Sequence, residues 1–206
     1  MKKYLSDSDV ISEAQKIIME FQDAFSRITI SDEFISAVKA IRKCNGVVVT
    51  SGMGKMGIAI KKFSSVLCSI GIPSCYLHPG EASHGDLGII THKDILFISS
   101  TSGKTREVLE VIDLARNINV KQIIGITSHI DSPIRDKVDI VLDMGIIQEA
   151  GHLRLAPTTS ILIMLALTDC LAMVLAKDKN LTKEQYSTYH HGGYNGAASR
   201  GDNKIY

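Results

Sequence analysis

The sequence predicts an α/β protein, a three-layer α-β-α sandwich around a five-stranded parallel sheet. Five short apolar segments are typical of strands: residues 46–50, 74–78, 95–99, 123–127 and 140–143. Between them, apolar residues recur at helical spacing, for example over residues 58–67 and 107–116. Strands that alternate with helices in this way form a parallel sheet with helices on both faces.

An N-terminal helical extension is expected ahead of this core. Candidate N-cap residues at 6–9 precede an apolar pattern of helical spacing that ends near Phe25, and Ser31 can cap a second helix. We therefore expect residues 1–43 to form helices that pack on the core or on another copy of the chain. At the other end, residues 197–206 are expected to form a tail.

Composition and charge narrow the possible partners. The 206 residues carry a net charge of +1 without a strongly basic run, which disfavours nucleic acid and anionic membranes. The four cysteines form no CxxC pair, and no apolar signal core follows the first residues, as expected for a cytoplasmic protein with reduced thiols. The most apolar stretch, residues 161–176, contains Asp169, so a core helix is expected rather than a membrane span.

The loop at residues 100–105, Ser-Thr-Ser-Gly-Lys-Thr, gives the strongest functional signal. It joins a predicted strand to a predicted helix. The start of a helix leaves backbone N–H groups unpaired and carries a partial positive charge. Hydroxyls and a glycine at such a place favour a bound phosphate, although a helix N-cap with spare hydroxyls is the simpler alternative.

Other polar loops follow the carboxyl ends of the predicted strands, where parallel sheets bind ligands. Together with the C-terminal segment they supply Lys55, His84, Glu107, Glu149, His190 and His191. Around a bound phosphate, such residues suit aldose–ketose isomerisation: a base moves a proton between C1 and C2, and a cation steadies the enediolate oxygen. No metal or redox cofactor is required. Each residue also has a structural alternative, such as a solvated lysine or a glutamate that favours its helix dipole.

Two nucleotide-binding motifs are incomplete. Residues 52–57 satisfy GxGxxG, but the strand that follows ends without the acid that would hold a ribose until Glu81. Gly103-Lys104-Thr105 ends like a Walker A loop, but Ile98 occupies the position of its first glycine. Neither dinucleotide binding nor nucleotide hydrolysis is therefore expected.

Longer strings can be matched to a family. The segments GMGK at 52–55, EASHGDLG at 81–88, STSGKT at 100–105 and HHGG at 190–193 occur in this order. They resemble the sugar isomerase (SIS) domain of bacterial D-arabinose 5-phosphate isomerases, over about residues 40 to 196. The resemblance implies a flavodoxin-like SIS domain at 44–196, in a short form without CBS domains. It also implies a homotetramer with active sites at subunit contacts.

The same resemblance implies an activity and its residues. The family interconverts D-ribulose 5-phosphate and D-arabinose 5-phosphate through an enediol, and the product feeds 3-deoxy-D-manno-octulosonate synthesis for lipopolysaccharide or capsule. By position, the catalytic set is Lys55, Glu107, Glu149 and His190. Either glutamate can be the base, and His190 can reach a neighbour's site. The residues expected to contact the phosphate and the sugar are Ser51, Gly52, His84, Ser100, Thr101, Ser102 and Thr105.

The chain departs from the family pattern at three places. Lys104 stands where relatives usually have an acid, His191 replaces a proline, and Gly151-His152 replaces Cys-Pro. Two other functions are considered: a SIS isomerase of the phosphohexulose type, and a non-catalytic sugar-phosphate sensor. Sensors normally carry a DNA-binding domain, which the sequence does not indicate, and the retained glutamates and His190 favour an enzyme.

Overall fold

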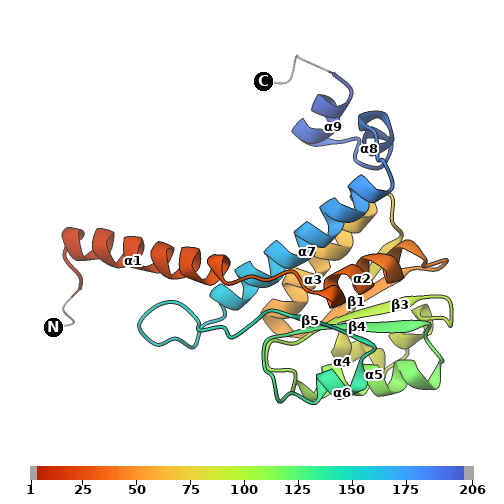
Figure 1. The fold of residues 1–206 in the computed structure, drawn as a ribbon, viewed down its shortest axis with the longest axis horizontal. Helices are drawn as coiled ribbons and strands as arrows, with labels where there is room; N and C mark the ends of the chain where they lie inside the picture. The colour runs from red at the N-terminus through yellow and green to blue at the C-terminus, as the bar shows by residue number, and fades with distance from the viewer. Residues whose placement is uncertain (1–3, 202–206) are drawn as a thin grey trace.

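The sheet forms as predicted. The computed structural model describes residues 4–201, in which parallel strands pair in the order β2-β1-β3-β4-β5 (Figure 1). The strands are β1 (Val48–Gly52), β2 (Ser74–Leu77), β3 (Ile95–Ser99), β4 (Gln122–Thr127) and β5 (Ile140–Asp143). Every residue of β1 and β3 is buried. Their uninterrupted apolar and β-branched sequences follow from this, because both faces of a parallel sheet are covered.

Helices cover both faces of the sheet, which confirms the three-layer prediction. On one face lie α2 (Asp32–Arg42), α3 (Gly54–Ser69) and α7 (Thr159–Asp178), and on the other α4 (Pro79–Ala82), α5 (Arg106–Asn117) and α6 (Ile134–Lys137). Phe63 of α3 packs on Phe97 of β3 with ring centroids 5.0 Å apart. The next residue of β3, Ile98, belongs to the opposite core together with Ile112 of α5. This alternation divides the interior into two apolar layers.

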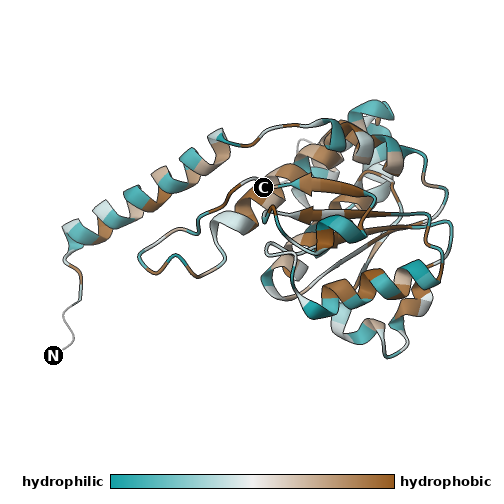
Figure 2. Cartoon of the chain, turned by 60° about the horizontal axis from the view of Figure 1, so that its bottom comes forward, coloured by the Kyte–Doolittle hydropathy of each residue, from teal (hydrophilic) through white to brown (hydrophobic). Residues whose placement is uncertain are grey.

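The first helix extends away from this core. α1 (Asp7–Ser26) begins at Ser6, which forms a capping box with Asp9. Ala24 is its buried residue, while several of its large apolar side chains are exposed: Val10, Ile11, Ile18, Met19 and Phe25. Figure 2 shows apolar positions along this helix, which stands clear of the sheet. α2, in contrast, packs against β5 and α7.

The long apolar segment forms a helix of the core. α7 is the one helix in residues 4–201 with the length and composition to cross a membrane, and 50% of its most apolar window is buried inside the protein. It packs along α3, and Asp169 forms an ion pair with Lys62 of that helix. Asp169 is also the charged residue that led us to expect a core helix instead of a membrane span.

The C-terminal segment is more helical than the sequence analysis expected. α8 (Lys183–Tyr189) starts with a capping box between Thr182 and Gln185, and α9 (Gly193–Ser199) follows. Residues 197–199 of the expected tail are therefore the last turn of α9, and 202–206 lie outside the described residues. The Tyr189 ring lies where a Cβ at Gly71 would stand, which fixes α8 against the turn after α3.

One strand begins later than predicted. β1 covers Val48–Gly52 instead of residues 46–50, because Val47 and the loop before β3 are tied to the buried carboxylate of Asp94. Its Oδ1 accepts from the Val47 N–H at 2.6 Å, and its Oδ2 accepts from the Thr91 N–H at 2.7 Å. The ladder then continues to Gly52, which pairs with Ser99 of β3.

We expect Asp94→Ala to lower the free energy of unfolding by about 2–4 kcal/mol, because two backbone donors lose a charged acceptor in the interior. Urea denaturation measures this change. Asp131→Ala is the matched control, since Asp131 is exposed in a turn and its removal should cost less than about 0.5 kcal/mol. Equal unfolding midpoints for the two variants would contradict the role of Asp94.

Candidate active site

The candidate site lies at the point in the sheet where the strand order reverses, between β1 and β3. From β1 the chain moves to β2 on one side and then to β3 on the other, so the loops after β1 and β3 lie side by side. Such a switch point leaves a crevice beyond the carboxyl ends of the strands. A pocket of about 230 Å³ lies there, lined by Met53, Met56, Ser99, Ser100, Thr101, Ser102, Thr105 and His129.

The loop at 100–105 is folded by its own hydroxyls. The Ser100 Oγ accepts from the Gly103 N–H at 3.0 Å and lies 2.9 Å from the Thr105 Oγ1. The Ser102 Oγ accepts from the Lys104 N–H at 3.2 Å. Thr105 is the N-cap residue of α5 but makes no side-chain cap hydrogen bond. The first-turn amides of α5 therefore remain available to an anion in the pocket.

The carbonyl of Thr101 anchors this loop to the end of β4. It accepts hydrogen bonds from the Thr127 hydroxyl at 3.1 Å and from the Ser128 hydroxyl at 3.0 Å. The Nδ1 of His129 lies 3.0 Å from the same oxygen. His129 thereby reaches the pocket wall, although the sequence analysis did not select it. The sequence feature that could have identified it is its place two residues after the predicted strand at 123–127.

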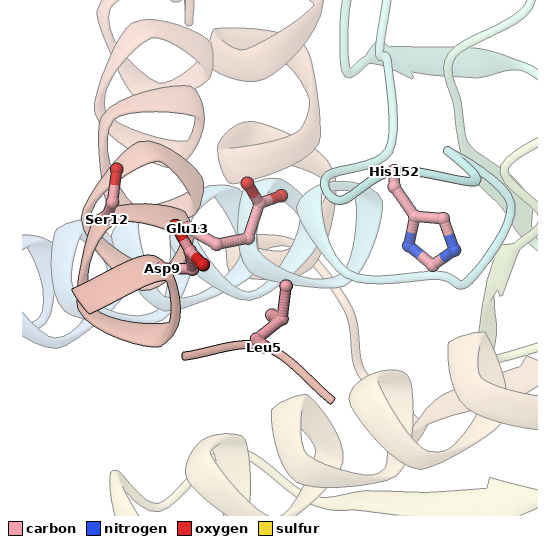
Figure 3. Close-up of a pocket in the computed structure, with 5 residues that line it drawn as sticks. All are labelled: Leu5, Asp9, Ser12, Glu13 and His152. Carbon is pink, nitrogen blue, oxygen red and sulfur yellow. The ribbon is translucent and has the colours of Figure 1, made fainter. Parts of the chain in front are cut away.

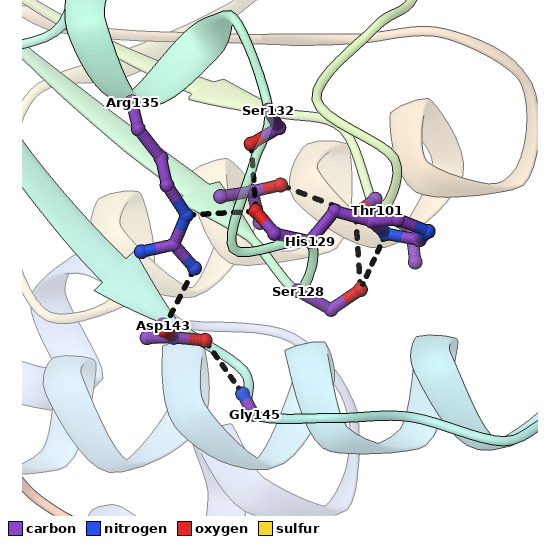
Figure 4. A network of polar contacts seen from close by, with 8 residues as sticks. Thr101, Ser128, His129, Ser132, Arg135, Asp143 and Gly145 are labelled. Atoms are coloured by element: carbon purple, nitrogen blue, oxygen red, sulfur yellow. Dashed lines mark hydrogen bonds and ion pairs between the residues drawn. The ribbon is translucent and has the colours of Figure 1, made fainter.

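A second set of hydrogen bonds connects the loop after β4 to the end of β5 (Figure 4). The His129 carbonyl accepts from the Ser132 hydroxyl at 2.8 Å and from the Arg135 Nε at 2.7 Å. Arg135 also donates to the Asp143 carboxylate at 2.7 Å, and that carboxylate accepts from the Gly145 N–H at 2.8 Å. The loops after β3, β4 and β5 are therefore held as one polar assembly.

The end of β1 supplies a buried hydroxyl without a partner. The Ser51 Oγ is fully buried and makes no hydrogen bond among the described residues. Beside it, a Cβ at Gly52 would collide with the Ser99 hydroxyl, so glycine is required there. The Tyr76 hydroxyl donates to the Gly52 carbonyl at 2.8 Å, and burial raises the pKa of Tyr76, which favours the donating form. Lys55 is exposed in the first turn of α3.

The two candidate bases occupy the starts of two helices. Glu107 is partly buried in the first turn of α5. The Glu149 Oε2 accepts from the Thr158 N–H at 2.8 Å and from the Ser160 N–H at 3.2 Å, which places this carboxylate at the amino end of α7. The hydroxyls of Thr159 and Ser160 are buried there without a partner among the described residues. Negative charge is electrostatically favoured at both positions.

The histidines lie in two different regions. His84 is exposed in the turn between α4 and η1 (Asp86–Ile89). His190 ends α8, where its Nδ1 lies 3.1 Å from the hydroxyl of Ser69 and its ring stacks on Tyr186. Ser69 is the last residue of α3, about 22 Å along that helix from the Gly54 end. Within one chain, His190 is therefore remote from the pocket, and α8 lies at the other end of α7 from the Glu149 loop (Figure 1).

Comparison with known proteins identifies the family. The model of the SIS domain family matches residues 40–174. The chain belongs to the SIS domain family. The matched region of this SIS domain contains the sheet, both pocket loops, Lys55, Glu107 and Glu149, whereas His190 lies beyond it.

Relatives with assigned names match most of the chain. The chain is 37% identical to the arabinose 5-phosphate isomerase KdsD of Pseudomonas aeruginosa over 187 residues, 90% of this chain and 57% of that protein. It is 40% identical to KdsD of Yersinia pestis over 164 residues, 80% of this chain and 50% of that one. The chain thus spans about half the length of the curated relatives that it matches.

Two solved structures match this SIS domain over almost their whole length. A putative phosphosugar isomerase involved in capsule formation from Bacteroides fragilis is 40% identical, with a TM-score of 0.86 over 90% of this chain and 99% of that chain. The E. coli CFT073 protein c3406, in complex with arabinose 5-phosphate, is 29% identical, with a TM-score of 0.86 over 90% of this chain and 100% of that chain.

Gly103→Ala is expected to disrupt the loop at residues 100–105. Gly103 has a φ of +62°, and a Cβ there would press on Ser132 and Ile134. We expect the free energy of unfolding to fall by about 2–3 kcal/mol, measured by thermal or urea denaturation. Gly88→Ala is the control, because a Cβ at Gly88 meets no atom within 4 Å. A loss of similar size in both variants would contradict the loop-specific explanation.

Proposed function

We propose that the protein is an aldose–ketose isomerase that interconverts D-ribulose 5-phosphate and D-arabinose 5-phosphate. The observation that carries the proposal is the likeness to a whole solved chain whose structure is a complex with arabinose 5-phosphate. The named arabinose 5-phosphate isomerases among the relatives, at 37% and 40% identity, support the same substrate. The pocket at the switch point supports it independently, because it has the chemistry of a phosphate site.

The phosphate end of the sugar is assigned to the two central loops. Ser100, Ser102 and Thr105 offer hydroxyls around the start of α5, whose amides and dipole favour an anion. Ser51 offers a buried hydroxyl that has no partner among the described residues. A phosphate ester oxygen would satisfy that hydroxyl, and Gly52, Thr101 and His84 complete the proposed contacts.

The carbonyl end requires proton transfer. A carboxylate, Glu149 or Glu107, takes the proton from C2 of the aldose and returns it to C1, while a second proton moves between O1 and O2. Lys55 is assigned the role of stabilising the negative charge that develops on the enediolate oxygen. No metal or cofactor takes part in this proposed reaction.

His190 is proposed to act in a neighbouring subunit. It is fixed at the end of α3 remote from the pocket, so it cannot complete the site of its own chain in this conformation. The exposed apolar side chains of α1 offer a surface on which copies can associate. We therefore assign a homotetramer with sites at subunit contacts, in the cytoplasm, which supplies 3-deoxy-D-manno-octulosonate synthesis for lipopolysaccharide or capsule.

The direct test incubates the pure protein with D-ribulose 5-phosphate in deuterated water and follows label at C1 and C2 together with the product. We expect label and arabinose 5-phosphate. Glu149→Gln should lower kcat by at least about 100-fold while retaining affinity for the phosphate ester, because the amide cannot take a proton. Exchange with a hexulose phosphate but not with D-ribulose 5-phosphate would overturn the substrate. Binding without any exchange would favour a sensor.

Mixing two inactive variants tests whether sites are shared between chains. When Glu149→Gln and His190→Ala chains are refolded or coexpressed together, a composite site that draws Glu149 from one and His190 from the other regains both groups. With random assembly, about one quarter of the sites should be active. Glu149→Gln mixed with Glu107→Gln is the control, because both changes fall on the same side of the site. Mixed oligomers without recovered activity would refute the sharing of His190.

A further inference from the structure

The loop that carries Glu149 contains backbone conformations that are energetically unfavourable. It joins β5 to α7 over residues 144–158, and most side chains from 152 to 157 are exposed. Gly151, two residues after Glu149, has a φ of +84°, and Arg154 has a φ of +52°. The left-handed region is unfavourable for a residue with a side chain such as arginine. Contacts from elsewhere in the protein must therefore stabilise this turn.

Among residues 4–201, the polar contacts that the turn at 151–154 receives from α1 come from one carboxylate. The Oε2 of Glu20 accepts from the Gly151 N–H at 3.2 Å, and its Oε1 lies 3.8 Å from the Arg154 guanidinium. The turn itself closes with a hydrogen bond from the Arg154 N–H to the Gly151 carbonyl at 3.2 Å. Glu20 thus contacts both residues of the turn that have a positive φ. Its side chain is 27% exposed, so the contact is partly shielded from water.

The loop side of the contact leads directly to the candidate base. From Gly151 the chain runs back through Ala150, whose N–H donates to the Thr158 hydroxyl at 3.1 Å, to Glu149. Glu149 in turn accepts from the Thr158 and Ser160 amides at the start of α7. The position of the carboxylate is therefore fixed between the start of α7 and the turn at 151–154.

Further along α1 the two segments separate. A pocket of about 560 Å³ lies between them, lined by Leu5, Asp9, Ser12, Glu13 and His152. Figure 3 shows His152 on the loop across this space from the acidic side chains of the helix. Among the described residues, Glu20 supplies the hydrogen bond and the ion pair that join α1 to the loop.

We propose that Glu20 is a positioning residue for the isomerisation: its carboxylate holds the turn at 151–154 in the shape that orients Glu149. The inference rests on the proposed function, in which Glu149 takes part in proton transfer. Glu20 is not among the residues that line the candidate pocket. Removing the Glu20 carboxylate should therefore slow the chemical step and leave the loop at residues 100–105, which joins β3 to α5, unchanged.

Kinetics of three variants test this role. Glu20→Ala should lower kcat for D-ribulose 5-phosphate by about 10- to 100-fold, with KM within about twofold. Glu20→Gln keeps an acceptor for the Gly151 N–H and should restore most of the activity. Asp23→Ala is the matched control on α1, because Asp23 pairs with Arg27, the C-cap residue of that helix, and it should match the unsubstituted protein. A raised KM with unchanged kcat would overturn the proposal.

A double variant shows whether Glu20 acts through Glu149. In the Glu149→Gln background, Glu20→Ala should cause little further loss, since residues that act as one unit are not additive. A full additional loss of about 10-fold would mean that Glu20 acts elsewhere and would reject the positioning role. Light scattering checks the oligomeric state. If Glu20→Ala changes it, Arg154→Asn removes the ion pair from the loop side and should lower kcat in the same direction.

Hydrogen exchange separates this inference from the proposed function. Amides of residues 150–156 and 158 should exchange faster in Glu20→Ala than in Asp23→Ala, whatever substrate the protein uses. Faster exchange in a protein that does not convert D-ribulose 5-phosphate would keep the structural contact and reject the proposed activity. Unchanged exchange together with unchanged kcat would reject the role of Glu20 alone.

Discussion

The parallel pairing of β1 with β3 determines where the polar loops of this chain meet. Both strands are buried at every residue and run in the same direction, so their last residues, Gly52 and Ser99, are paired neighbours. The helices that follow, α3 and α5, then start at the same edge of the sheet, and α7 joins them there after β5. Three positive helix ends at one edge create a field that favours carboxylate and phosphate groups.

Much of the fold follows from local sequence patterns. Residues 95–99 and 140–143 were predicted as strands with the boundaries that the structure has, because continuous apolar segments between turns are typical of buried strands. β1 was displaced by two residues, since Asp94 lies 47 positions from Val47 and no local pattern reveals that they bond. No helix was predicted for α8, although its capping box between Thr182 and Gln185 is visible in the sequence, because its residues are polar and carry no apolar helical pattern.

The candidate site was predictable to the extent that strand ends could be located. The hydroxyl loop at 100–105 and the polar end of β1 were placed correctly at one edge, since both directly follow buried strands. The division into domains and the roles of the site residues stay predictions. Contacts between distant segments could not be foreseen: Glu20 meets Gly151 across 131 positions, and His190 meets Ser69 across 121. Such pairings depend on how helices pack and leave no periodic signal.

The place of His190 has a consequence for how such a protein would work in a cell. Its imidazole is held on α8 by Ser69 and Tyr186, at the end of α3 that faces away from the pocket. Under the proposed function, a complete site exists only where copies of the chain meet. The fraction of chains that form working sites then depends on protein concentration, so specific activity falls on dilution. In a cell, the reaction would proceed at an appreciable rate only when the protein is expressed above the concentration at which its copies associate.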